Sequence, residues 1–413
     1  MTALLLALTQ IVVVGLPAAL LLDRDDSPSR ARLLGEAFLL GSGIVWLVLF
    51  TLSGLGLGWS RLSVTVALLV VAISLWIPAR KVVREAGPPE ARATWIDLGT
   101  LIVLGAHAFV AAEKPVRHGD FWAIWGLKAR VFFEHGSIDW AFLLGPFNWY
   151  QHSDYPLLLP FNYLLVALHE GGWSDRWMGP VTTLYAVALA LIVRDLFARE
   201  LPRHVAALAT LGVAAVGASP WIGLADAPMV AYGTAGLLLM RRRVTPLSAI
   251  LLGLAACSKN EGLLLIAVVV LVLVLVGRVR EVVSLWPAVA LSVPWLALRA
   301  WHRLEGDLLP SAFDLDRVGP ILRGIAQEPP ARPLLWVGLA AALVLLVGSL
   351  RRERFVLLTC LFQGLAYVAV YLISPHDVSW HIVYSWPRLL EHVTVPLVFA
   401  TLLIAGSTAT TGK

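Results

Sequence analysis

The sequence predicts an all-α protein, a polytopic transmembrane helical bundle. Of its 413 residues, 59% are hydrophobic and only 14% are charged. A soluble domain is nearer half apolar and a quarter charged. The apolar residues also gather in runs long enough to cross the roughly 30 Å of hydrocarbon in a bilayer. Together with a mean hydropathy of +0.79, these runs indicate an integral membrane protein.

Apolar runs of sufficient length predict about 13 membrane-spanning helices. The longer runs lie near 3–22, 33–54, 61–79, 96–112, 177–194, 204–219, 262–277, 283–300, 333–350, 354–373 and 387–406. Two shorter runs, 227–240 and 244–257, fit tilted or partly buried spans. The first run lacks the basic residues that precede the apolar core of a signal peptide, so we expect it to be retained as a span.

The basic residues lie in short clusters between these runs, which is the pattern of a topology signal. The net charge of +5 therefore does not indicate nucleic-acid binding. When the loop after Ala112 is placed outside, most basic clusters, Arg241 to Arg243 among them, fall in loops on the cytoplasmic side, where lysine and arginine concentrate. The sequence thus predicts an external N-terminus and a cytoplasmic C-terminus in the plasma or inner membrane.

This orientation gives three external loops, at 113–176, 301–332 and 374–386. The first loop is large, and its segment 120–135 is rich in aromatic residues, which concentrate at the headgroup level of a bilayer. Its apolar run 157–168 is too short to span easily. We therefore expect an interfacial helix in 120–135 and an interfacial or re-entrant helix in 157–168. No repeat or low-complexity linker divides the chain, so three N-terminal spans in 1–95 and a module in 96–413 are expected to form one integrated domain.

Common soluble motifs are absent. Cys257 and Cys360 both lie in or beside apolar runs, so neither a disulfide framework nor a cysteine metal site is indicated. The chain has no P-loop and no glycine-rich dinucleotide turn. His152 and Asp154, with His376, could offer nitrogen and oxygen ligands to a divalent metal, although nothing in their spacing requires one. No other cofactor is indicated.

Charged side chains that interrupt an apolar chain mark its candidate functional site, because such groups are costly in lipid and usually face a cavity. On the predicted external side these are Asp120, His152, Asp154, Asp226, Lys259, Glu261 and Arg388. Each also has a structural interpretation. The three aspartates could cap helix N-termini, Lys259 and Glu261 could neutralise each other, and Arg388 could be an interfacial anchor.

At these residues the chain resembles the GT-C class of membrane glycosyltransferases, and in particular the bacterial group similar to protein O-mannosyltransferases and lipid A aminoarabinose transferases. The resemblance covers roughly 95–400. It rests on an acid that closely follows a span, on several short motifs and on a late basic residue. These are Asp120, His152-Ser153-Asp154-Tyr155-Pro156-Leu157-Leu158-Leu159-Pro160, Asp175-Arg176, Ala225-Asp226-Ala227-Pro228, Ser258-Lys259-Asn260-Glu261-Gly262 and Arg388.

The resemblance implies transfer of one sugar, a hexose or a pentose, from a polyprenyl-phosphate donor to a protein, lipid or glycan acceptor outside the membrane. The family's first-loop acid is the general base, so Asp120 would take that role, and inversion at the anomeric carbon is expected. Lys128, Lys259, Arg176 and Arg388 could supply cations for the phosphate, with His152, Asp154, Asp226 and Glu261 as further binding residues. The chain departs from the pattern where Phe121, not a second acid, follows Asp120, and where three spans precede the matching region.

Two alternatives remain open from the sequence. A secondary transporter would also place charged residues in broken helices, although typically near the bilayer midplane and in paired repeats. A non-catalytic membrane scaffold could keep the fold without the activity. The location of the charges in external loops and the absence of a visible repeat favour the enzyme.

Overall fold

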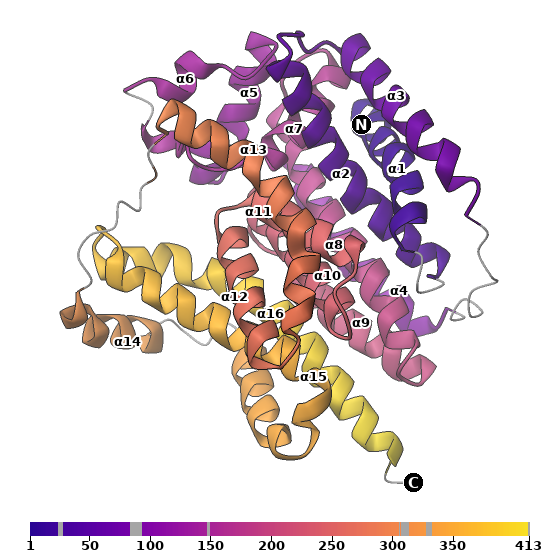
Figure 1. Ribbon diagram of the computed structural model, residues 1–413, viewed down its shortest axis with the longest axis vertical. Coiled ribbons are helices and arrows are strands. Elements are labelled where there is room, and N and C mark those ends of the chain that lie inside the picture. The colour runs from indigo at the N-terminus through magenta and orange to yellow at the C-terminus, as the bar shows by residue number, and fades with distance from the viewer. Residues whose placement is uncertain are drawn as a thin grey trace.

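The computed structural model describes residues 1–23, 28–82, 93–146, 149–304, 306, 314–327 and 333–411. Helices make up 81% of the structure, and no strand occurs in these ranges. The predicted all-α class is therefore confirmed for this part of the chain. The helices pack into one elongated bundle, with the N-terminus among the first helices and the C-terminus at the opposite end (Figure 1).

Eight described helical segments are long and apolar enough to cross a membrane. They lie in α1 (Thr2–Leu22), α2 (Arg30–Gly54), α3 (Arg61–Ala79), α4 (Trp95–Glu113), η3 with α8 (Asp175–Trp177 and Met178–Ala198), η4 with α13 (Val279–Leu285 and Trp286–His302), α15 (Pro333–Ile373) and α16 (Val378–Thr411). The remaining elements are η1 (Phe121–Trp125), α5 (Gly126–His135), α6 (Trp140–Leu144), η2 (Trp149–Gln151), α7 (Leu158–Glu170), α9 (Arg203–Gly217), α10 (Asp226–Met240), α11 (Pro246–Ser258), α12 (Glu261–Leu275), η5 (Leu315–Arg317) and α14 (Val318–Gln327).

The difference from the predicted count of about 13 lies mainly in the middle of the chain, where several helices are shorter than the roughly 20 residues that a span needs. Helices α9, α10 and α12 have 15 residues each and α11 has 13. At 1.5 Å per residue, 15 residues extend about 22 Å. Near the C-terminus, helix α15 covers both predicted runs, 333–350 and 354–373, without a break in its helical backbone.

The predicted loops are largely helical. Helix α16 begins at Val378, inside the predicted loop 374–386. The predicted loop 301–332 contains the end of α13 together with η5 and α14, while residues 305, 307–313 and 328–332 lie outside the described ranges. Whether the helices in 113–176 lie at a membrane interface stays a prediction, but parts of both predicted segments pack inside the protein. Every residue of α7 from Leu158 to Leu168 is buried, and Trp125 and Phe132 of the aromatic segment also point into protein.

The first three helices share a hydrophobic core with the rest of the chain. One cluster of buried apolar side chains extends from Ala7 to Ile404. Polar contacts reinforce this packing: the hydroxyls of Ser42 and Tyr185 lie 2.5 Å apart, and the Tyr232 hydroxyl donates to the Leu39 carbonyl at 2.7 Å. These hydrogen bonds join helix α2 to α8 and α10, and α10 begins at one of the polar residues described below.

Helices α1 and α2 approach closely because each has a glycine where the two cross. A Cβ on Gly15 would lie 1.9 Å from the Ala37 carbonyl oxygen, and one on Gly41 would lie 1.8 Å from that of Ile11. Both neighbours are backbone atoms, so they cannot rotate away. Small residues at helix interfaces allow this close packing in membranes.

We expect Gly15→Ala or Gly41→Ala to lower the thermal unfolding midpoint of the purified protein in detergent. The added methyl group forces the helices apart, and such overpacking costs about 1–3 kcal/mol. Gly105→Ala is the matched control, because a Cβ there meets nothing within 4 Å. An unchanged midpoint for both α1 and α2 variants would contradict this account of the helix crossing.

Candidate functional site

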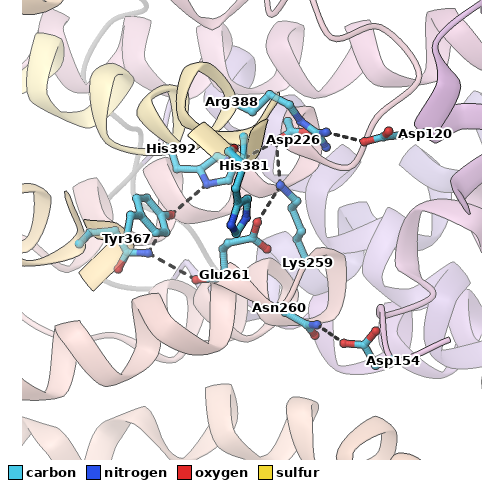
Figure 2. A network of polar contacts seen from close by, with 12 residues as sticks. Asp120, Asp154, Asp226, Lys259, Asn260, Glu261, Tyr367, His381, Arg388 and His392 are labelled. Atoms are coloured by element: carbon cyan, nitrogen blue, oxygen red, sulfur yellow. Dashed lines mark hydrogen bonds and ion pairs between the residues drawn. The ribbon is translucent and has the colours of Figure 1, made fainter. Parts of the chain in front are cut away.

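Charged side chains from four separate parts of the chain meet at one end of α10 and α12 (Figure 2). We call this the charged network, and it consists of Asp120, Asp226, Lys259, Glu261, Arg388 and His392. Asp120 directly precedes η1, and Asp226 is the first residue of α10. Lys259 and Glu261 lie at the junction of α11 and α12. Arg388 and His392 lie one turn apart on α16.

The carboxylate of Asp226 is the centre of the network. Its Oδ2 accepts from Arg388 Nη2 at 2.8 Å and from Arg388 Nε at 3.1 Å. Its Oδ1 accepts from Lys259 Nζ at 3.0 Å and lies 3.3 Å from His392 Nε2. Asp226 is completely buried, and a buried carboxylate is stable only when cations and hydrogen-bond donors surround it.

Arg388 connects Asp226 to Asp120. While Nη2 and Nε contact Asp226, Nη1 forms an ion pair with Asp120 Oδ2. The guanidinium also lies over the ring of Trp221, 6.0 Å from its centroid, within the range of a cation–π contact. The side chain of Asp120 is 34% exposed whereas that of Asp226 is 0% exposed. Asp120 is therefore the carboxylate of this pair that a molecule in solution or lipid can reach.

Asp120 does not act as a helix cap, because its side chain makes no capping hydrogen bond to η1. Asp226 is already inside α10, and Leu157 rather than Asp154 precedes α7. The capping interpretation is therefore wrong for all three aspartates.

His118 lies beside Asp120, whose backbone N–H donates to His118 Nδ1 at 3.1 Å. Burial lowers the pKa of His118, and the nearby Arg388 lowers it further while Asp120 opposes the change, so the imidazole favours its neutral form.

Lys259 joins Asp226 to Glu261. Its ammonium group lies 2.8 Å from Glu261 Oε1 as well as 3.0 Å from Asp226. The expected neutralisation of Lys259 by Glu261 therefore exists, but the same lysine also serves the centre of the network. Gly262 lets the two helices meet here, because a Cβ on it would lie 2.4 Å from backbone atoms of Ala255 and Ala256.

His392, Tyr367 and Gln363 extend the network into the bundle, and sequence reasoning missed all three. The hydroxyl of Tyr367 lies 2.9 Å from His392 Nδ1, and it accepts a hydrogen bond from Gln363 Nε2 at 2.8 Å. These side chains lie within apolar runs that were interpreted as spans. The available signal was the spacing of His392, which follows Arg388 by four residues and so shares its helix face.

A second group of polar residues lies beside the charged network, and we call it the loop cluster: Lys128, His152, Asp154, Asn260 and Arg299. Asn260 Nδ2 donates to Asp154 Oδ2 at 2.7 Å, and Arg299 Nη2 lies 3.5 Å from the same oxygen. Burial raises the pKa of Asp154, whereas Arg299 and Lys128 act to lower it. Because Asn260 follows Lys259 directly, the turn between α11 and α12 contributes to both groups. Asn260 and Arg299 were not among the predicted site residues.

Lys128 and His152 hold the loop that carries Asp154. Lys128 is fully buried, and its ammonium donates to the carbonyl of His152 at 2.5 Å. His152 has a left-handed backbone, with φ of 51°, and its ring stacks on Tyr155 at 4.8 Å. Tyr155 in turn stacks on Trp125 at 5.4 Å. In this arrangement the predicted phosphate-binding lysine fixes a loop next to the charged network.

Arg176 takes no part in either group. Its guanidinium is exposed, donates to the carbonyl of Ala112 at 3.2 Å and lies over the ring of Trp177 at 5.3 Å. It thereby connects the start of α8 to the end of α4. In the described part of the chain, no three histidine, cysteine, aspartate or glutamate side chains come together as ligands for a metal ion.

We expect Asp226→Asn to destabilise the protein strongly, by about 3–5 kcal/mol, because it leaves Arg388 and Lys259 buried without their shared counter-ion. The measurement is the thermal unfolding midpoint in detergent, compared with the wild-type protein. Asp316→Asn provides the control, since Asp316 is exposed and lies in η5. Equal midpoints for the two variants would show that the Asp226 ion pairs do not hold the helices together.

Comparisons of the chain with protein families, with curated proteins and with solved structures find no match. The arrangement of side chains in the two polar groups is therefore the basis for the function proposed next.

Proposed function

We propose that the chain is an integral membrane glycosyltransferase of the GT-C class, which transfers a sugar from a polyprenyl-phosphate donor to an acceptor on the external side. The observation that carries this proposal is the contact of Arg388 with both Asp120 and Asp226. It brings one accessible carboxylate next to cations that are held in place by a buried carboxylate. Such a transfer requires a carboxylate to accept the acceptor's proton and cations beside it to bind the leaving phosphate.

Asp120 is the general base in this mechanism. The hydroxyl oxygen of the acceptor forms a bond to the anomeric carbon while the bond from that carbon to the phosphate oxygen breaks. The hydroxyl proton passes to Asp120, and the polyprenyl phosphate leaves with the electron pair. A positioned carboxylate of this kind contributes typically 10²–10⁴-fold to the rate. One displacement of this type inverts the anomeric configuration.

Arg388 and Lys259 supply the positive charge that the leaving phosphate needs. An arginine binds phosphate through paired N–H donors, and fixed cations at a site of developing charge are an efficient form of catalysis. The side chain of Arg388 is 13% exposed and that of Lys259 is 4% exposed. Arg388 is therefore the cation that contacts the phosphate. Lys259 contributes its positive charge from a distance and keeps Asp226 in place. The loop cluster around Asp154 offers carboxylate, amide and guanidinium groups for sugar or acceptor hydroxyls.

The proposal includes a topology of about 13 crossings. They are the eight long segments, α9 to α12 as short helices surrounded by longer ones, and a second crossing for the two predicted runs in α15, which requires the chain to turn back within that helix. The N-terminus is then outside, the C-terminus is cytoplasmic, and the charged network faces the exterior. The order of the chain supports this arrangement. Asp226, at the start of α10, lies in the network, whereas the arginines that follow Met240 lie about 22 Å away along that helix.

Cysteine labelling in intact cells tests this orientation. A cysteine replacing exposed Arg323 on α14 is expected to react with an impermeant thiol reagent, whereas one replacing exposed Lys81 after α3 is expected to react only after lysis. The native Cys257 and Cys360 are buried, which keeps the background low. The opposite pattern of labelling would refute the proposed orientation.

For catalysis, we expect Asp120→Asn to reduce sugar transfer by at least 10²-fold while the unfolding midpoint changes little, because Asn cannot accept the proton and Asp120 is partly exposed. Glu113→Gln is the control, as it removes an exposed carboxylate from the nearby end of α4. The assay measures product formed from a polyprenyl-phosphate sugar. Full turnover by the Asp120 variant would exclude it as the base.

Mass spectrometry of lipid that co-purifies with the protein tests the donor class separately. A bound polyprenyl-phosphate sugar, with less of it on an Arg388→Gln variant, is the expected result. A water-soluble solute in place of such a lipid would instead favour the transporter alternative. A bound donor lipid with no turnover under any condition would favour a non-catalytic scaffold.

A further inference from the structure

A hollow of about 460 Å³ lies at the end of α10 opposite Asp226 and the charged network. We call it the arginine hollow. Its walls come from the ends of α1 and α8, from the turn between α10 and α11, and from the start of α2. Pockets that bind small molecules or cofactors have volumes of roughly 300–1,000 Å³. The hollow is thus large enough for a ligand and lies far from the residues used in the proposed reaction.

Five arginines line this hollow, compared with two acids. The arginines are Arg32, Arg199, Arg241, Arg242 and Arg243, and the acids are Asp23 and Glu200. Glu200 is shared, because it forms ion pairs with both Arg241 and Arg242. Arg242 therefore shares its carboxylate with a second arginine.

The more buried of these arginines form ion pairs with acids, most of which do not line the hollow. Arg32 contacts Glu36 at 2.7 Å and Asp23 at 2.9 Å, and Arg199 contacts Asp195 at 2.7 Å. Arg241 also lies 3.3 Å from Glu353. These pairs fix the walls in position. Among the lining arginines, Arg242 and Arg243 are exposed neighbours in the chain, so they form the rim that an entering anion meets first.

Apart from these charged residues and Thr245, the lining of the hollow consists of leucines. Leucines from α1, α8, α10 and α11 line it, among them Leu196, Leu239 and Leu247. Exposed arginines next to these leucines, which we call the leucine floor, match a molecule with a phosphate at one end and hydrocarbon at the other. Basic pockets between transmembrane helices are a recognised type of site for anionic lipid headgroups.

We infer that the arginine hollow binds a phosphate-bearing anion, with Arg242 and Arg243 contacting the phosphate. The phosphate can belong to the headgroup of an anionic phospholipid or to a soluble anion, and the two sources differ in whether the leucine floor is used. This site is separate from the charged network and does not depend on the glycosyltransferase proposal. It gives Arg242 and Arg243 a binding role in addition to the topology signal that their sequence pattern provides.

The test uses the full-length protein in nanodiscs and two probes. The first probe is phosphatidylglycerol, measured by native mass spectrometry as lipid retained against a phosphatidylcholine background. The second probe is inorganic phosphate, measured by calorimetric titration at constant ionic strength. The double variant Arg242→Gln/Arg243→Gln removes the rim, and it is compared with Arg80→Gln/Lys81→Gln. The control pair is exposed, follows α3 at the same end of the bundle and lies outside the hollow.

The rim variant is expected to weaken binding of at least one probe by about tenfold or more, since each basic residue near a phosphate surface contributes on the order of 1 kcal/mol. The control pair is expected to change it by less than about twofold. Loss of phosphatidylglycerol alone identifies a lipid, and loss of inorganic phosphate identifies a soluble anion. Equal weakening by both double variants, or no selective binding of either probe to the wild-type protein, would overturn the proposal.

A second variant fills the hollow without changing its charge. Leu239→Trp adds volume to the floor from a half-buried position on α10. If a lipid is the ligand, this variant is expected to reduce phosphatidylglycerol retention to a similar degree as the rim variant. Unchanged retention of phosphatidylglycerol in Leu239→Trp, together with its loss in the rim variant, would refute the role of the leucine floor, because the lipid would then bind through the charged rim alone.

Discussion

The buried carboxylate of Asp226 is the interaction on which the rest of the structure depends. A carboxylate removed from water needs cations nearby, and here Arg388 comes from α16 while Lys259 comes from the turn between α11 and α12. One acid therefore determines the mutual position of three segments that are far apart in the chain. The position of Asp120 is linked to this centre, because the guanidinium that contacts Asp226 also forms the ion pair with Asp120.

The sequence predicted the charged network well because its members are rare residue types in an apolar chain. Asp120, Asp226, Lys259, Glu261 and Arg388 were chosen because charge is costly in lipid, and the structure brings all of them together. Tyr367 and Gln363 could not be chosen in this way, since such side chains inside an apolar run look the same whether they face lipid or a polar neighbour. Arg176 shows the opposite error. It is charged and close in sequence to a helix start, yet it contacts only Ala112 and Trp177 among the groups described.

The helical class was predictable for the same reason, whereas the path of each helix through the bundle was not. Hydropathy reports how apolar a segment is, but not whether protein or lipid surrounds it. Helix α7 is too short to span easily and was predicted to be interfacial or re-entrant, and the structure shows it buried from Leu158 to Leu168 against neighbours that include α1, α2 and α5. Helix α4 has a similar apolar character, and most of its surface is exposed. Distinguishing these two cases requires the positions of the other helices.

The depth of the charged network explains how one of its acids can be accessible while the other is sealed. The network lies at the first residues of α10 and α12 but well inside α16, where His392 follows Val378 by 14 residues, or about 21 Å of helix. The short helices thus end at this level and the long ones continue past it. Asp226 lies at the end of a short helix enclosed by its neighbours and is fully buried. Asp120 directly precedes η1 and is partly exposed, at the boundary between the protein interior and its surroundings. The proposed base must lie at such a boundary, because the acceptor has to reach it while the cations stay largely buried.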